Sequence, residues 1–80
     1  MLEIEYKKDF LKNISKIKHA AKKEKIKKQI EKIIDNPEIG KPMRYNRKGT
    51  RELYISPYRI AYSFSSNKII FLEIYHKDVQ

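Results

Sequence analysis

The order of apolar and polar positions predicts three segments in the first half of the chain. Residues 2–6 alternate between apolar side chains and glutamate, a period of two that is typical of a β-strand with one buried face. In residues 10–17 and 26–34, apolar side chains return every three or four positions, as they do on one face of a helix. We place the boundary between the two helices around residues 16–20. An Asn-Pro pair at residues 36–37 ends the second helix, because proline cannot continue it.

The second half of the chain returns to a period of two. Residues 37–49 contain both glycines and are predicted to form a loop. Alternating segments follow at residues 51–55 and 58–64, and residues 68–75 are nearly unbroken apolar sequence, as in the middle of a sheet. Short polar turns separate these segments, which favours an antiparallel meander. The order β-α-α-β-β-β predicts an α+β fold, with a two-helix hairpin packed on one face of a small, mainly antiparallel sheet, in a single domain spanning residues 1–80.

Composition adds a strong positive charge to this picture. The 80 residues include 19 Lys and Arg against 10 Asp and Glu, a net charge of +9, and 40% are hydrophobic, which is enough for a core. The absence of cysteine excludes disulfides and thiolate ligands, and we expect no metal and no cofactor. No apolar run approaches the ~20 residues that span a bilayer, so we expect a cytoplasmic protein without a membrane partner. So basic a surface favours a polyanionic partner, nucleic acid first.

The arginines are confined to the second half of the chain, after residue 43. The rigid donor fork of arginine suits one particular phosphate, whereas lysine provides a diffuse field. If the apolar side chains of residues 58–64 pack under the helices, Arg59 projects from the opposite, open face of the sheet. The preceding loop leads onto this sheet, and its cations are expected to follow a nucleic acid backbone. They are Lys41, Arg44, Arg47 and Lys48.

Four short motifs occur in order along the chain. They are NPEIGKPMR at residues 36–44, GTREL at 49–53, YRIAY at 58–62 and IYHKDV at 74–79. Each motif is weak alone, but together, at these spacings, they resemble the RelE/ParE toxin superfamily over nearly the whole chain. The resemblance implies the toxin of a type II toxin–antitoxin pair, built as a small sheet backed by two helices.

The resemblance also implies targets and partners. RelE-like members bind the ribosomal A site and cut messenger RNA there without a metal, whereas ParE-like members poison DNA gyrase. In both groups a small antitoxin wraps the toxin, and the pair represses its own operon. The partners implied are a RelB-like antitoxin, the ribosome with its mRNA, and operator DNA through the antitoxin complex.

Metal-free RNA cleavage needs a base for the ribose 2′-hydroxyl, an acid for the leaving oxygen and cations that stabilise the phosphorane. The resemblance implies that Arg59, in the Tyr-Arg motif, stabilises the phosphate, and Arg51 on the preceding strand is a looser match. His76 falls in the family's C-terminal His-Arg motif as a general acid or base, and Lys77 takes the place of its arginine. Two tyrosines near these motifs are expected to contact RNA, since tyrosine stacks on bases: Tyr58 and Tyr75.

Three hypotheses remain open from the sequence. The first is a ribosome-dependent mRNA endonuclease. The second is a ParE-like gyrase inhibitor, which gains weight because residues 77–80 lack the tyrosine found beyond the His-Arg pair in RelE-like enzymes. The third is a weakened toxin that acts mainly in antitoxin binding and operon autoregulation. If the last strand runs straight, His76 shares a face with Ile70, Leu72 and Ile74, and it reaches the open face only if the strand ends or bulges.

Overall fold

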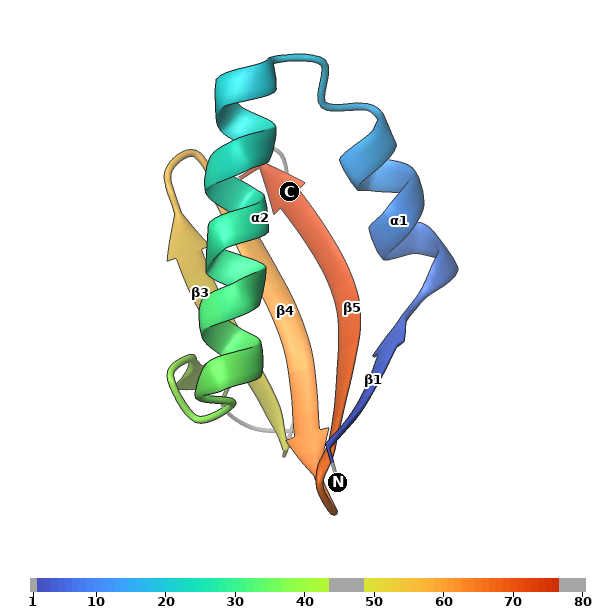
Figure 1. Cartoon of the computed structure of the whole chain (residues 1–80), viewed down its shortest axis with the longest axis vertical. Coiled ribbons are helices and arrows are strands. Elements are labelled where there is room, and N and C mark those ends of the chain that lie inside the picture. Colours follow the sequence, from blue (N-terminus) through green and yellow to red (C-terminus); the bar gives the residue numbers. More distant parts are fainter. Residues whose placement is uncertain (1, 44–48, 77–80) are drawn as a thin grey trace.

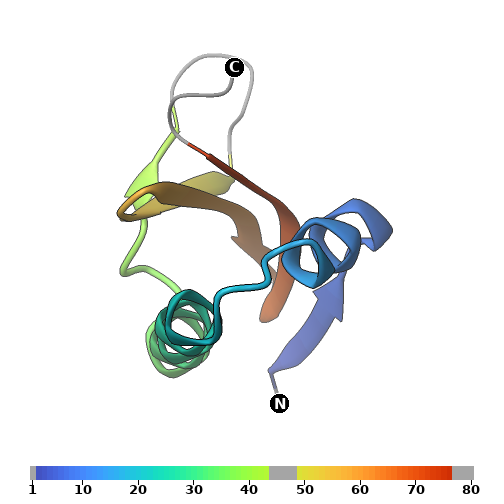
Figure 2. The same ribbon diagram turned by 90° about the horizontal axis from the view of Figure 1, so that it is seen from above.

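Two helices cover one face of a mixed five-stranded sheet in the computed structural model, which describes residues 2–43 and 49–76 (Figure 1). The helices are α1 (Lys8–Ser15) and α2 (Ala20–Asp35). The strands are β1 (Glu3–Tyr6), β2 (Lys41–Pro42), β3 (Thr50–Ile55), β4 (Tyr58–Ser65) and β5 (Lys68–His76). Seen from above, both helices lie on the same side of the sheet (Figure 2). The predicted α+β fold is confirmed.

The sheet has the order β1-β5-β4-β3-β2. Its last three long strands form the predicted antiparallel meander. β1 pairs in parallel with β5, from Glu3 opposite Lys68 to Tyr6 opposite Phe71. β2 is a two-residue edge strand that the sequence did not predict, and it brings Lys41 opposite Glu52 of β3. No helix in the described part of the chain is both long and apolar enough to cross a membrane.

The core lies between the helices and the covered face of the sheet. Phe10 of α1 packs against Phe71 of β5, with ring centroids 5.3 Å apart, and Ile26 and Ile33 of α2 are buried beside it. The isoleucine stripe of the second helix is therefore core, as its period indicates. The largest fully buried side chains are Tyr62, Phe10, Phe71, Ile33, Ile60 and Ile69. Burial of such side chains contributes about 1.5–3 kcal/mol each.

A bulge in β5 decides which of its side chains face the helices. Phe71 pairs with Tyr62 of β4 and Glu73 pairs with Ala61, so Leu72 is one residue more than the partner strand has. An extra residue of this kind reverses the alternation of the strand beyond it. The last strand therefore does not run straight, and the bulge turns His76 toward the helices and away from the open face, the opposite of what the sequence predicts for a bulged strand.

Candidate functional site

The open face of the sheet carries three polar side chains in mutual contact, Glu52 of β3, Arg59 of β4 and Tyr75 of β5. The Arg59 Nη1 donates a hydrogen bond to Glu52 Oε1 at 3.0 Å, and the Tyr75 hydroxyl donates to Glu52 Oε2 at 2.6 Å. Arg59 and Tyr75 are cross-strand partners, and Glu52 pairs with Ala61, two residues further along β4, so all three project from the same face. We call these three residues the open-face cluster.

A hollow of about 540 Å³ adjoins this cluster. Its lining comprises Ile39, Lys41, Glu52, Leu53, Tyr54 and Arg59. The guanidinium carbon of Arg59 lies 5.9 Å from the centre of the Tyr54 ring, a distance at which a cation and an aromatic face attract each other. Lys41 stands opposite Glu52 in the β2–β3 pair and so belongs to the same face. The hollow thus combines two cations, a carboxylate and an exposed ring, which suits a phosphate that carries a base.

The electrostatics of the cluster favour a protonated phenol. Burial raises the pKa of Tyr75, and the hydrogen bond and negative charge of Glu52 raise it further. Tyr75 therefore keeps its proton at neutral pH and is able to donate it. The Nε of Arg59 is buried and makes no hydrogen bond to any described residue. A buried donor without an acceptor costs about 1–3 kcal/mol.

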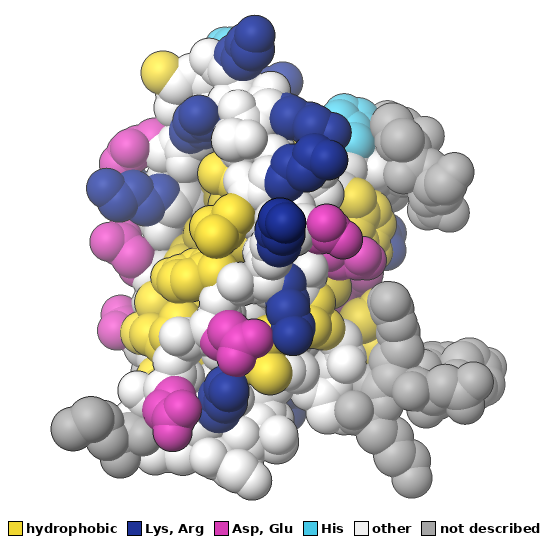
Figure 3. Space-filling model, turned by 90° about the vertical axis from the view of Figure 1, so that its right-hand side faces the viewer, with side chains coloured by type: hydrophobic (Ala, Val, Ile, Leu, Met, Phe, Trp, Pro, Cys, Tyr) yellow, Lys and Arg dark blue, Asp and Glu magenta, His cyan; other side chains and the backbone are white. Residues whose placement is uncertain are grey.

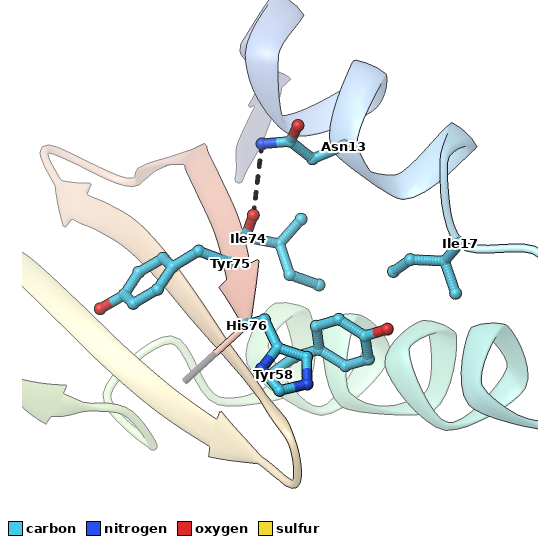
Figure 4. A pocket seen from close by; sticks show the side chains of 6 residues that line it. All are labelled: Asn13, Ile17, Tyr58, Ile74, Tyr75 and His76. Atoms are coloured by element: carbon cyan, nitrogen blue, oxygen red, sulfur yellow. Dashed lines mark hydrogen bonds between the residues drawn. The ribbon is translucent and has the colours of Figure 1, made fainter. Parts of the chain in front are cut away.

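His76 lies on the other face of the sheet. It pairs with Tyr58 across β4 and β5, and the two rings meet edge to face at 5.5 Å with an interplanar angle of 78°. They line an open hollow of about 290 Å³ together with Asn13 of α1, which donates from Nδ2 to the Ile74 carbonyl at 3.3 Å (Figure 4). In this view the Tyr75 ring points away from the two others. The structure therefore separates His76 and Tyr58 from Arg59.

Arg51 also lies on the helix-covered face, because it precedes Glu52 on β3 and pairs with the buried Tyr62. Its Nη1 donates to the backbone carbonyls of Glu38 at 3.1 Å and Gly40 at 2.8 Å. The Arg51 guanidinium thus contacts the chain's own backbone, away from the open-face cluster.

Comparison with known proteins identifies the family. Residues 4–79 match the family model described as the ParE toxin of type II toxin–antitoxin system, parDE. The chain belongs to this toxin family. No curated protein sequence matches it.

Solved structures similar to this toxin agree on the fold. The toxin is similar to a chain of the intact Escherichia coli RelBE toxin–antitoxin complex, with 15% identity, 95% and 96% of the two chains covered and a TM-score of 0.78. A RelBE complex from Mycobacterium tuberculosis gives 17% identity, coverage of 94% and 96% and a TM-score of 0.77. Escherichia coli YafQ gives 19% identity, coverage of 98% and 96% and a TM-score of 0.75. At these identities the likeness establishes the RelE/ParE fold alone.

The predicted site residues of the toxin fall into three groups. Arg59, Tyr75 and Lys41 lie on the open face, whereas Arg51 and the pair of Tyr58 and His76 lie on the helix-covered face. The remaining predicted residues lie outside the described residues: Arg44, Arg47, Lys48 and Lys77.

Glu52 is the residue that sequence reasoning missed, although strand alternation alone would have placed it on the face of Arg59. In residues 2–43 and 49–76, no group of three or more His, Asp or Glu side chains is close enough to hold a metal ion.

Proposed function

We propose that this toxin cleaves messenger RNA in the ribosomal A site without a metal and that a cognate antitoxin neutralises it. The open-face cluster carries the proposal, because Arg59, Glu52 and Tyr75 supply a cation, a carboxylate and a phenol within hydrogen-bonding distance of one another. These are the three kinds of group that the reaction needs. The ribosome enters through the resemblance to RelE-like toxins, and the net charge of +9 supports an RNA-rich target.

The cluster would divide the chemistry as follows. The Glu52 carboxylate takes the proton of the ribose 2′-hydroxyl, and the 2′ oxygen forms a bond to phosphorus. Arg59 stabilises the charge that accumulates on the phosphorane. The bond from phosphorus to the 5′ oxygen then breaks, and Tyr75 gives its proton to that oxygen. The products are a 2′,3′-cyclic phosphate and a 5′-hydroxyl end. A proton transfer from Glu52 to Tyr75, whose oxygens lie 2.6 Å apart, restores the starting state.

Primer extension on a defined message, with and without programmed ribosomes, tests this proposal. We expect cuts within the A-site codon only when ribosomes are present. Arg59→Ala, Glu52→Gln and Tyr75→Phe should each slow cleavage by about 100-fold or more, the usual contribution of a general acid, base or charge-stabilising group. Lys28→Ala, an exposed position on α2, is the matched control for charge. Unchanged cleavage by Arg59→Ala would refute the proposed chemistry.

His76→Gln separates the two possible proton donors. Because His76 lies on the helix-covered face, we expect its loss to slow cleavage far less than Tyr75→Phe. A larger loss in His76→Gln would assign the proton transfer to the histidine, as the family motif implies, and would remove Tyr75 from the mechanism.

Inhibition of DNA gyrase is the second candidate function. The match to the ParE toxin model favours it, as does the separation of His76 from Arg59, since a gyrase inhibitor needs no acid–base pair. Expression that accumulates gyrase-cleaved DNA, without cuts in any message, would support this alternative.

An apolar groove between the helices supports the antitoxin as partner. Ile14 of α1 and Ile26 and Ile30 of α2 line a hollow of about 270 Å³, and Lys23 and Lys27 border it. On the side of the molecule that carries α1 and β1, hydrophobic side chains also reach the surface beside a column of basic ones (Figure 3). Such a groove suits an amphipathic helix with an acidic outer face.

Ile30→Glu tests the groove as the antitoxin's docking site. The new carboxylate should weaken binding of the antitoxin, taken as the small acidic protein encoded beside the toxin gene, by at least about tenfold in calorimetric titration. Lys32→Glu, two residues further along α2 at an exposed position, is the control that changes charge without entering the groove. Equal affinity of the Ile30→Glu variant and the unmodified toxin would exclude this groove.

A further inference from the structure

The backbone between α2 and β2 is held by a buried tyrosine. The Tyr62 side chain is 0% exposed, and its hydroxyl donates to the Pro37 carbonyl at 2.7 Å and accepts from the Gly40 amide at 2.8 Å. Burial raises the pKa of Tyr62, so the hydroxyl keeps the proton that the first bond needs. A Cβ on Gly40 would lie 2.5 Å from the Tyr62 oxygen. The close approach of this backbone to the ring therefore requires glycine.

Arg51 holds the same backbone from a second direction. Its Nη1 donates to the carbonyls of Glu38 and Gly40, and its Nη2 lies 4.0 Å from the Glu38 carboxylate. Gly40 is thus fixed at both its amide and its carbonyl, the first by Tyr62 and the second by Arg51. One guanidinium nitrogen thus donates to two carbonyls while the other lies beside a carboxylate, so the planar group meets three acceptors through two nitrogens, where lysine has one nitrogen on a shorter side chain.

This double anchor lies directly before the cation of the open face. Lys41 follows Gly40 in the chain and stands opposite Glu52, and beyond β2 the Met43 amide donates to the Thr50 carbonyl at 2.9 Å. A two-residue edge strand contributes too few ladder bonds to fix its own position. The orientation of Lys41 toward the open-face cluster therefore depends on the fixed position of Gly40.

We infer that Arg51 and Tyr62 are positioning residues, which act through Gly40 to hold Lys41 beside the open-face cluster, where Lys41 binds an RNA phosphate. The RNA in this inference rests on the proposed function. Arg51, predicted from the sequence as a catalytic residue, thus acts on the reaction without touching the substrate. In this role the contact of its guanidinium with the two backbone carbonyls is what matters, and its charge toward RNA is secondary.

A double-mutant cycle between Arg51 and Lys41 tests the inference, with a fluorescein-labelled single-stranded RNA of 20 nucleotides as probe. Arg51→Lys keeps the charge but replaces the two guanidinium nitrogens with one nitrogen on a shorter side chain, so we expect it to weaken RNA binding as much as Lys41→Ala does, about tenfold. The double variant should bind no more weakly than Lys41→Ala alone. Full affinity in Arg51→Lys, or losses that multiply in the double variant, would overturn the inference, because both indicate a direct and independent charge contact.

Hydrogen exchange supplies a measurement that needs neither RNA nor activity. In Arg51→Lys the Gly40 amide should exchange at least about tenfold faster, while the Ile60 amide in the centre of β4 keeps its protection. If Arg51→Lys does not fold, Arg51→Gln provides the same comparison with a side chain that keeps one donor group. An unchanged Gly40 exchange rate in the folded variant would show that Arg51 does not hold this backbone.

The two proposals fail in different ways. Absence of ribosome-dependent cuts by the unmodified toxin would refute the proposed function, whereas the exchange rate of Gly40 and the cycle with Lys41 would still decide the positioning role. Ribosome-dependent cuts that remain at full rate in both Arg51→Lys and Lys41→Ala would overturn the positioning role and leave the proposed function intact.

Discussion

Replacement of Gly40 by alanine would place a methyl group against the hydroxyl and ring edge of Tyr62. The new Cβ would lie 2.5 Å from the hydroxyl oxygen, 2.8 Å from Cε1 and 3.0 Å from Cζ. Tyr62 is fully buried and bonded to Pro37 and Gly40, so the ring has no free space into which to move. Overpacking costs about 1–3 kcal/mol, and loss of the two hydrogen bonds adds about 1 kcal/mol each. We expect Gly40→Ala to lower the free energy of unfolding by about 3–5 kcal/mol.

Urea unfolding followed by circular dichroism measures this loss, and Gly49→Ala is its matched control. Gly49 has φ of +82°, and no atom of the described residues lies within 4 Å of a Cβ added there, so Gly49→Ala should lose only about 1–2 kcal/mol from backbone strain. Tyr62→Phe removes the nearest clashing atom, so the double variant with Gly40→Ala should lose less than the sum of the two single losses. A Gly40→Ala variant that unfolds at the urea concentration of the unmodified toxin would refute the close packing.

A core truncation and the dependence of stability on high and low pH test three further parts of the molecule. Ile33→Ala, at a fully buried position of α2, should lose about 2–5 kcal/mol in urea unfolding. Burial raises the pKa of Tyr62 above its ordinary value of 10.0, so its contribution to stability is complete below pH 10.0 and is lost as pH rises through the native pKa. Tyr62→Phe should therefore flatten the fall in melting temperature in alkali. Hydrogen bonds from Lys68 and then Lys7 lower the pKa of Glu5 below 4.5. The contribution of Glu5 to stability is therefore complete above pH 4.5 and is lost as pH falls through the pKa of the folded state. In Glu5→Gln the melting temperature should therefore fall less steeply as the pH is lowered.

The sequence predicts the long elements well because their periods are strong. Six lysines surround the apolar stripe of α2, so the buried face of that helix is unmistakable. β2 escapes prediction because two residues, one of them proline, show no period at all. The parallel pairing of β1 with β5 was not predicted for another reason: a period of two identifies a strand but not which strands pair with it.

The candidate site was predictable only where the strands are regular. β4 alternates without interruption from Tyr58 to Ala61, so the open-face position of Arg59 follows from sequence alone. β5 is different, because Ile70, Leu72 and Ile74 are all apolar and the pattern carries no polar residue to reveal a change of face. Whether Tyr75 or His76 accompanies Arg59 could not be read from that segment.

The bulge resolves this choice for a physical reason. A straight β5 with Phe71 buried would turn the Glu73 carboxylate into the core and Ile74 out of it. Burial of an unpaired charge costs several kcal/mol, and exposure of an isoleucine costs about 1.5–3 kcal/mol more. A bulge that leaves one strand residue unpaired therefore has the lower free energy. The same bulge places Tyr75, and not His76, beside Arg59. The open face therefore carries a phenol whose pKa is raised by burial and by the neighbouring Glu52 carboxylate, whereas the His76 imidazole lies on the helix-covered face.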